Sequence, residues 1–370
     1  MIVTTERLLD LMVNAFKPGD ADLRRIFTHD LTRDPGCPPG SRVVVMDGDD
    51  PAAALLVFER RLRLGAAVVP TACIGAVATD PARKGKGFGG RLMAAAHERI
   101  RAMGLPWVLL IGIDHFYSRL GYRPCLCEDR ATVLIDHLPP GPEAGEAATD
   151  ADEAELLALS RACYRDGAWM REHGPGTFAT QLERSWFGIG HIRVLRQDGR
   201  IRAWHLRRGD TLHQAAADGA DAAAWVWRDA ARAARAEDPA AAELHAALPA
   251  GHPCRRILAG LPYRSQPGVK SYGNFLGLVL DEAAFTAAVA PELLARAAAL
   301  GRGGIALRIG ATAHRLGDGA IAVAMPDAAT LMTAVSGIAP VAHLPVDGDA
   351  VLLDALFPVR GNGFTRLEYF

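Results

Sequence analysis

A basic, glycine-rich stretch between residues 73 and 103 limits the possible folds of this chain more than any other feature. Residues 73–79 are small or β-branched and lead into a turn marked by Pro81, which is typical of a buried strand. Four glycines follow, and residues 91–103 (RLMAAAHERIRAM) are rich in strong helix formers. The sequence therefore predicts a strand, a glycine loop and the start of a helix in direct succession.

The loop has the composition of an anion-binding site. Gly85, Gly87, Gly89 and Gly90 lack a Cβ atom, so the backbone can adopt positive φ and approach a ligand closely. A helix that begins after the loop presents unpaired N–H groups and the positive end of its dipole, which favours an anion such as pyrophosphate. Positive charge is added by Arg83, Lys84, Lys86 and Arg91.

Two nucleotide-binding motifs match the loop only in part. The run GKGFGG has the glycine spacing of the dinucleotide fingerprint, but that fingerprint needs an acidic residue about 20 positions later, and Asp114 lies farther away. A phosphate loop of the nucleotide-hydrolase type needs Ser or Thr after its lysine, whereas Lys86 is followed by Gly87. Both nucleotide-binding interpretations are therefore weak.

Residues 77–89 resemble, position by position, the acetyl-CoA loop of the GNAT superfamily of N-acetyltransferases, V-x-T-x-P-x-x-[QR]-x-x-G-x-[GA]. Lys84 stands where the family has Gln or Arg, which keeps the charge but loses the planar fork of a guanidinium. The resemblance implies that acetyl-CoA is the co-substrate. The cofactor-binding residues that it implies are Val77, Ala78, Thr79, Lys84, Gly85, Lys86, Gly87, Phe88, Gly89 and Gly90.

A second motif of the same family lies further along the chain. Residues 116–122 (FYSRLGY) resemble its FYxxLGF signature, and Tyr117 falls at the position of the catalytic tyrosine. The resemblance implies that Tyr117 is the general acid, because a phenol with a pKa of about 10 can give a proton to a departing thiolate. Packing in the core is the alternative for Tyr117, and it is the favoured interpretation for Tyr122.

The order of the predicted elements is that of a GNAT domain, and the same order recurs once, from residue 152 onward. The first set ends with a short helix closed by Gly121 and a last strand at 131–136, before a Pro/Gly-rich break at 138–148. The second set has no glycine loop between residues 205 and 225, so we expect a GNAT-like domain without its own cofactor site. The predicted elements are helix 5–17, hairpin 43–64, strand 73–79, helix 91–103 and strand 107–111, then a helix from 152, hairpin 192–206, helix 221–236 and strand 243–248.

The remainder of the chain alternates helical and strand patterns. A helix over 282–300, strands at 305–309 and 321–324, and a helix with Asp327 as its N-cap are expected. Two GNAT folds and such a tail resemble the Eis (enhanced intracellular survival) group, whose third domain is similar to a sterol carrier protein. We therefore expect an α/β (α+β) chain of tandem GNAT folds, each a mixed, splayed sheet flanked by helices, followed by a small α+β sterol-carrier-like domain. The expected domains are 1–137, 146–272 and 273–370.

The Eis-like resemblance also implies a catalytic base. In that group the terminal carboxylate of the chain reaches the active site of the first domain, and here the chain ends at Phe370. An apolar tail could anchor this carboxylate as the proton acceptor, although a frayed C-terminus is an equal alternative. His115 is a further candidate base, because imidazole titrates near neutral pH, although a surface histidine is the commoner outcome.

Composition narrows the possible partners. With 41 basic and 42 acidic residues the net charge is −1, so nothing suggests nucleic-acid binding. The six cysteines are scattered and lack a neighbouring histidine cluster, so no metal is expected. No apolar run reaches the length of about 18 residues that a membrane span needs, so we expect a cytoplasmic protein without a membrane partner.

These observations predict an acetyl-CoA-dependent N-acetyltransferase. The acceptor is expected to be a primary amine of a small molecule (aminoglycoside-like or polyamine) or of a lysine side chain, which attacks directly in a ternary complex because no cysteine has the context of a nucleophile. The Eis-like resemblance implies a homo-oligomer, a hexamer in that group. The alternatives are a non-catalytic acyl-CoA sensor or carrier, for which Lys84 leaves room, and a nicotinamide-binding enzyme.

Overall fold

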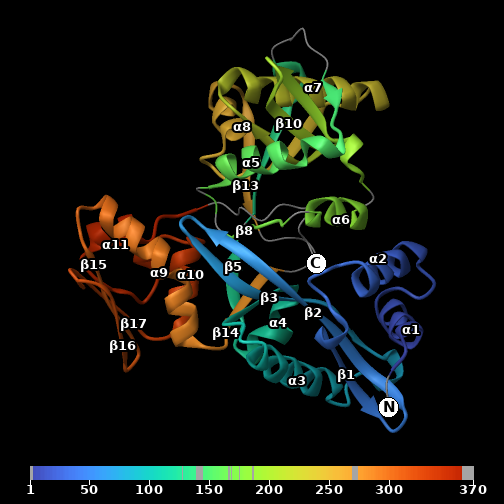
Figure 1. Ribbon diagram of the computed structural model, residues 1–370, viewed down its shortest axis with the longest axis vertical. Helices are drawn as coiled ribbons and strands as arrows, with labels where there is room; N and C mark the ends of the chain where they lie inside the picture. The colour runs from blue at the N-terminus through green and yellow to red at the C-terminus, as the bar shows by residue number, and fades with distance from the viewer. Residues whose placement is uncertain are drawn as a thin grey trace.

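The structure is a computed structural model that describes residues 3–126, 128–138, 145–165, 167, 169–174, 176–185, 187–268 and 274–360. It has three lobes, each built around its own sheet (Figure 1). The first lobe, at the lower right, holds both motifs of the candidate site. The second lobe lies above it and the third to its left. Among the described residues, no helix has both the length and the apolar character needed to cross a bilayer.

The first lobe is a splayed sheet with helices on both faces. Its strand order is β1-β2-β3-β4-β14-β5. Helices α1 and α2 pack on one face; each starts at a capping side chain, Thr4 or Asp20, that accepts a hydrogen bond from the first turn. Helix α3 covers the other face and α4 lies near the end of β4. The elements are α1 Thr5–Phe16, α2 Ala21–Thr32, β1 Arg42–Asp47, β2 Asp50–Leu64, β3 Ala67–Thr79, α3 Phe88–Ala102, β4 Trp107–Gly112, α4 Asp114–Tyr117, β5 Arg123–Leu126 and β14 Asn274–Val279.

The second lobe repeats this arrangement. Its sheet contains β9-β10-β11-β12-β6-β13 in the order in which the first contains β1-β2-β3-β4-β14-β5, with β7 added at one edge. This repetition confirms the predicted tandem folds. The elements are β6 Glu128–Leu134, β7 Glu146–Ala147, α5 Glu153–Tyr164, α6 Thr177–Arg184, β9 Arg193–Gln197, β10 Arg200–Arg208, β11 Thr211–Ala217, α7 Ala220–Glu237, β12 Glu243–Ala247, α8 Pro253–Arg256 and β13 Tyr263–Gly268. The short strand β8 Met170–Arg171, between α5 and α6 in the chain, belongs to the first sheet.

The two lobes exchange a strand. β6 follows β5 in the chain but pairs with β12 and β13 of the second sheet, while β14 follows β13 but lies between β4 and β5 of the first. The prediction that the strand near 131–136 completes the first sheet is therefore wrong. Its run of β-branched and apolar residues indicates a strand but carries no information on which sheet receives it. The expected boundaries at 137 and 273 each separate a strand from the sheet that it joins.

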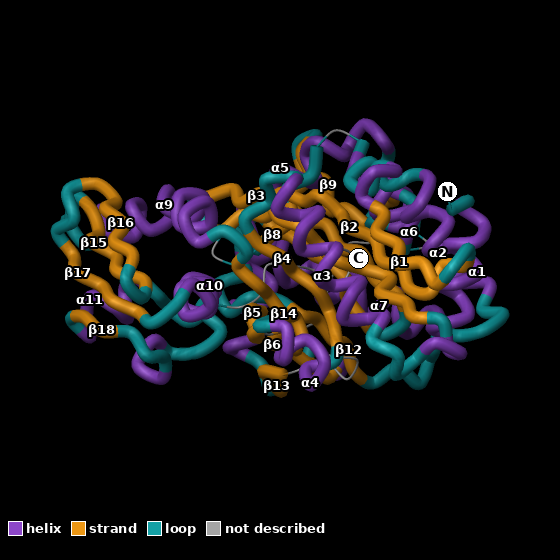
Figure 2. The backbone as a smooth tube through the Cα atoms, turned by 90° about the horizontal axis from the view of Figure 1, so that it is seen from below, coloured by secondary structure: helices purple, strands orange, loops and turns teal. Residues whose placement is uncertain are grey.

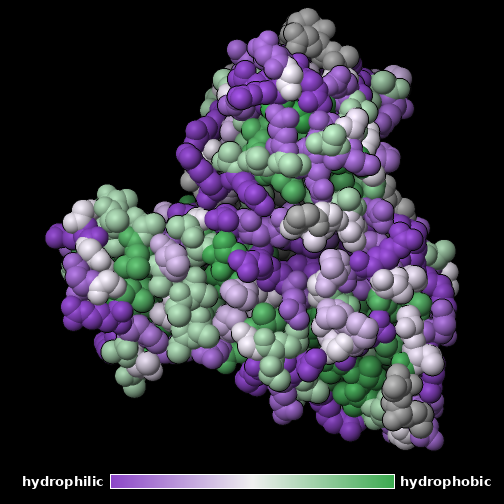
Figure 3. All heavy atoms as spheres, in the orientation of Figure 1, coloured by the Kyte–Doolittle hydropathy of each residue, from purple (hydrophilic) through white to green (hydrophobic). Residues whose placement is uncertain are grey.

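The third lobe packs against the first. Its sheet has the order β16-β15-β17-β18, and alternation along β15 buries Ile305 and Leu307 while exposing Ala306 and Arg308. Figure 3 shows apolar residues over much of this lobe and hydrophilic ones over much of the second. Likeness to a sterol carrier protein stays a prediction. The elements are α9 Glu282–Ala299, β15 Gly304–Ile309, β16 Thr312–Gly317, β17 Ile321–Met325, α10 Ala328–Ser336, β18 Asp347–Gly348 and α11 Ala350–Leu356.

Buried aromatic side chains join the lobes. The ring centroid of Trp107 on β4 lies 4.5 Å from that of Trp169, which precedes β8, and 5.6 Å from that of Phe285 on α9. The indole N–H groups are satisfied, because Trp107 donates to Thr71 and Trp169 to Ser336. β8 also pairs with the far end of β2. Figure 2 shows the third lobe reaching away from the other two, with α9 and α10 between its sheet and the first sheet.

Candidate active site

Strand β3 separates from β4 halfway along its length. The two pair in parallel only over residues 72–74, yet β3 continues to Thr79. Ala76 has φ of +51°, and the register of β3 with β2 shifts at the same place, which marks a bulge. Such a conformation is strained for a residue with a side chain and tends to occur at functional sites. The backbone of residues 75–79 therefore faces the opening between β3 and β4, where an extended ligand can pair with it as an added strand.

The glycine loop leads directly into the uncapped start of a helix. Gly85 and Gly87 have φ of +79° and +80°, and a Cβ at either would meet no atom within 4 Å. Glycine is needed there for the backbone conformation and not for space. Gly89 and Gly90 lie in the first turn of α3, which begins at Phe88, three residues earlier than predicted, and has no side-chain cap. The free N–H groups of this turn suit an anionic ligand.

The basic residues of the loop divide into two groups. Arg83 donates to Asp47 at 2.9 Å and binds Asp80, so it ties the loop to the β1–β2 turn. Lys84 and Lys86 are exposed and have no ion-pair partner within the described part of the chain. The guanidinium of Arg83 is surrounded by the carboxylates of Asp47, Asp50 and Asp80. Arg83 therefore holds the loop in place, and its charge is already balanced by these groups and not left for a phosphate.

Tyr117 is buried beside the end of β4. Its side chain is 7% exposed, and its ring lies edge-on to those of Phe116 and Tyr122, with centroids 4.9 and 5.6 Å away. Burial raises the pKa of Tyr117 to about 12, so the phenol is protonated at neutral pH. Its hydroxyl makes no hydrogen bond to any described residue. An acid that keeps its proton and has no partner suits the predicted role, which stays a prediction.

Tyr122 belongs to the core, as the favoured interpretation has it. It is 1% exposed, and its hydroxyl lies 2.8 Å from Nε2 of His97 on α3. Burial lowers the pKa of His97 to about 4, so its imidazole is neutral and can accept this hydrogen bond. The pair holds Tyr122 against the ring of Tyr117.

Of the two candidate bases, His115 is among the described residues. Phe370 lies outside the described residues, which end at Arg360. The Arg360 guanidinium donates to Glu292 at 3.0 Å, and the backbone N–H of Arg360 donates to the carbonyl of Gly337 at 2.8 Å. His115 lies exposed on α4, next to Asp114. The role of Phe370 and that of His115 both stay predictions.

Two residues that the sequence analysis did not assign shape the site. Phe116 contacts the loop, because a Cβ built on Gly89 would lie 3.5 Å from its ring. Gly112, the last residue of β4, lies against the Tyr117 ring. The FYSRLGY motif contains Phe116 but does not indicate that its ring contacts Gly89. For Gly112, the only sequence signal was its place at the end of an apolar strand.

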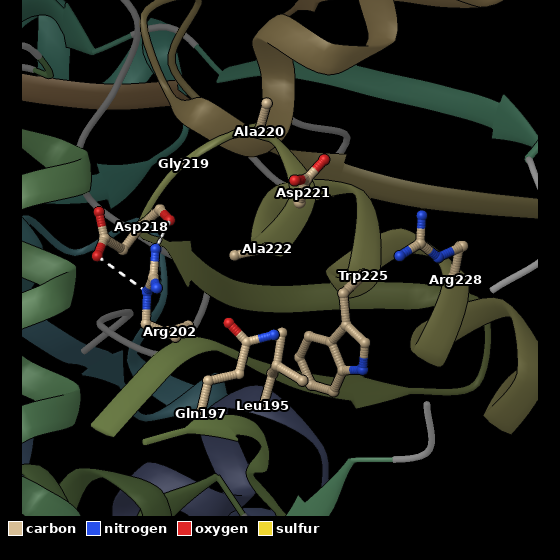
Figure 4. Close-up of a pocket in the computed structure, with 10 residues that line it drawn as sticks. All are labelled: Leu195, Gln197, Arg202, Asp218, Gly219, Ala220, Asp221, Ala222, Trp225 and Arg228. Carbon is tan, nitrogen blue, oxygen red and sulfur yellow. Dashed lines mark hydrogen bonds and ion pairs between the residues drawn. The ribbon is translucent and has the colours of Figure 1, made fainter. Parts of the chain in front are cut away.

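The second lobe lacks an equivalent loop. β11 and β12 pair in parallel only at Thr211 and Leu212, and α7 begins beside a cavity of about 350 Å³. However, only residues 218–219 join β11 to α7, whereas residues 80–87 join β3 to α3. Figure 4 shows Asp218 and Asp221 at this helix start, with Asp218 accepting from Arg202 at 3.1 Å. Carboxylates at this place disfavour a pyrophosphate, because like charges repel.

Comparison with known proteins agrees with this geometry. Residues 4–125 match the profile of an acetyltransferase (GNAT) domain. The match covers about a third of the chain and lies within the first lobe. No curated protein matches the sequence.

Solved structures extend the likeness to all three lobes. A GCN5-related N-acetyltransferase from Kribbella flavida has a TM-score of 0.72 at 19% identity, over 100% of this chain and 97% of that one. A second, from Anabaena variabilis ATCC 29413, has a TM-score of 0.66 at 12% identity, over 96% and 94%. Eis1 from Mycobacterium abscessus has a TM-score of 0.58 at 14% identity, over 97% and 96%. At these identities the likeness establishes a shared fold.

Proposed function

We propose that this protein is an acetyl-CoA-dependent N-acetyltransferase with its site in the first lobe. The observation that carries the proposal is the combination of a splayed, bulged β3 with a glycine loop that opens α3 and a protonated Tyr117 beside the opening. Residues 77–79 would bind the pantetheine arm through their backbone. The loop from Lys84 to Gly90 would hold the pyrophosphate, with Lys84 and Lys86 supplying the free positive charge.

The bound acetyl-CoA supplies an activated acetyl group, and the protein contributes positioning and proton transfer. Tyr117 Oη would give its proton to the leaving sulfur, and a terminal carboxylate at Phe370 would accept the proton of the incoming amine. A main-chain N–H near the Ala76 bulge would stabilise the negative charge that develops on the carbonyl oxygen.

Direct attack by the amine is supported by the state of the cysteines. All five cysteines that the structure describes are buried, and none of them forms a disulfide with another described residue. Burial raises the pKa of Cys37 to about 12 and that of Cys163 to about 11, which keeps these thiols protonated. Neither is a ready nucleophile for an acyl-enzyme, so a ternary complex is the simpler route.

Replacing Tyr117 tests the acid. With Tyr117→Phe, turnover should fall by about 10²-fold or more, because general acid catalysis typically contributes 10²–10⁴. The affinity for acetyl-CoA should stay within about twofold, since the phenol does not touch the pyrophosphate loop. Turnover is measured as thiol release with a panel of polyamines, aminoglycosides and lysine peptides. An unchanged rate would remove Tyr117 from the mechanism.

The same panel separates an enzyme from a carrier. An acyl-CoA sensor, the alternative that Lys84 leaves open, would bind acetyl-CoA but release no thiol with any acceptor. Deleting Phe370 or extending the C-terminus should lower kcat if its carboxylate is the base, whereas an N-terminal extension of equal length should not. A homo-oligomer, with a hexamer as the Eis-like expectation, is tested by sedimentation of the intact chain.

A further inference from the structure

Gly112 lies directly against the ring of Tyr117. A Cβ built on Gly112 would lie 2.1 Å from Cε2 and 2.5 Å from Cδ2 of that ring, distances at which two carbon atoms overlap. The φ angle of Gly112 is not among the positive ones, so the backbone there accepts any residue. Glycine is therefore required at this position because of Tyr117 and not because of the chain path.

The backbone at Gly112 has little freedom to withdraw. It is paired with Asn274 of the exchanged strand β14, and Leu110, two residues earlier, is paired with both β14 and Ile74 of β3. The added carbon would also lie 2.9 Å from Cδ1 of Leu110. A side chain at 112 therefore meets a fixed strand, and relief comes from moving the Tyr117 ring.

The Tyr117 ring is enclosed by two further aromatic rings. Tyr122 is held by its hydrogen bond to His97, and Phe116 rests against Gly89 at the start of α3. The ring thus has contacts with β4, with the core and, through Phe116, with the glycine loop. Displacing it from β4 would move its hydroxyl relative to the opening between β3 and β4.

We propose that Gly112 is a positioning residue that sets the place of the Tyr117 hydroxyl at the opening of the sheet. Its catalytic meaning rests on the proposed function, whereas the contact itself does not. Gly112 lies outside the predicted cofactor loop, so its replacement acts through Tyr117.

The kinetic test uses Gly112→Ala. We expect kcat to fall by about tenfold or more with the KM for acetyl-CoA within about twofold, because the acid is misplaced while the loop is untouched. In a Tyr117→Phe background the same change should lower kcat no further. Gly40→Ala is the matched control, since the only atom near an added carbon there is the end of the Arg99 side chain at 3.0 Å. A wild-type kcat in Gly112→Ala, or a full additional loss in the Tyr117→Phe background, would overturn the proposal.

A stability measurement tests the contact without activity. Gly112→Ala should lower the Tm, and the loss should disappear in a Tyr117→Ala background, where the ring that clashes is gone. If Gly112→Ala alone does not fold, the double variant should. Equal losses of Tm in both backgrounds would disprove the contact. If thiol release is absent with every acceptor but the two changes are coupled in Tm, the proposed function fails and the packing relation stands.

Discussion

At the scale of single residues, burial sets the protonation state of the groups around the candidate acid. The pKa of Tyr117 is raised to about 12 and that of His97 is lowered to about 4, in each case because the charged form is disfavoured away from water. Both side chains are therefore neutral near pH 7. Tyr117 keeps its proton for the leaving group, and His97 stays able to accept from Tyr122.

The raised pKa of Tyr117 predicts the alkaline side of the pH–rate profile. An acid whose pKa lies above its usual value of 10 stays protonated to higher pH, so its loss begins only as pH approaches 12. With saturating substrates, kcat should show no decrease from this group between pH 7 and about 10.5. The measurement is thiol release across that range. A decrease with an apparent pKa near 10 that disappears in Tyr117→Phe would contradict the assigned environment.

At the scale of elements, the sequence predicts the helices, strands and caps that depend on neighbouring residues, but not the pairing of strands that lie far apart in the chain. The strand–loop–helix unit, the Gly121 cap with φ of +90° and the Asp327 cap, which accepts from Thr330, all follow from neighbouring residues. The exchange of β6 and β14 depends on which sheet has a vacant position, and no short stretch of sequence encodes that. The Ala76 bulge and the capture of Arg83 by three carboxylates likewise depend on β2 and its turn.

The strand exchange predicts that the first domain does not fold when cut at its expected boundary. A fragment of residues 1–137 lacks β14, so β4 and β5 present open edges, and it carries β6 without its partners. Open, apolar edges promote aggregation. We expect this fragment to be insoluble or to bind no acetyl-CoA, as measured by calorimetry beside the full chain. A monomeric fragment that binds acetyl-CoA as the full chain does would show that β14 is dispensable.

At the scale of the whole molecule, a buried ionic cluster joins the first and third lobes. Glu292 on α9 is 5% exposed and accepts from the Ala66 N–H of the β2–β3 turn at 2.8 Å, from Arg296 at 2.7 Å and from Arg360 at 3.0 Å. The same carboxylate thus fixes the base of the third lobe to the first lobe and holds the last described residue.

Removing the charge of Glu292 should destabilise the chain strongly. Glu292→Gln leaves two guanidinium groups without their buried counter-charge, which typically costs about 3–5 kcal/mol. Glu282→Gln on the same helix is the control, because among the described residues Glu282 pairs with His314 alone, near the surface, and the loss of this pair should cost about 1 kcal/mol or less. Denaturant unfolding measures both. Equal, small effects would show that the cluster does not hold the lobes together.

One acetyl-CoA site per chain, at the start of α3, is the central claim, and calorimetric titration of the full chain with acetyl-CoA tests it without knowledge of the acceptor. With Gly87→Ala, a relaxed loop is favoured over the left-handed conformation by about 1–2 kcal/mol, and pyrophosphate binding has to restore that conformation, so affinity should fall roughly fivefold to thirtyfold. Gly176→Ala makes the matched change at the N-cap of α6 in the second lobe, where the backbone is also left-handed with φ of +73° and an added carbon meets no atom within 4 Å, and it should leave affinity unchanged. We predict one site per chain with this pattern of effects. Two sites per chain, or equal weakening by both variants, would contradict the account.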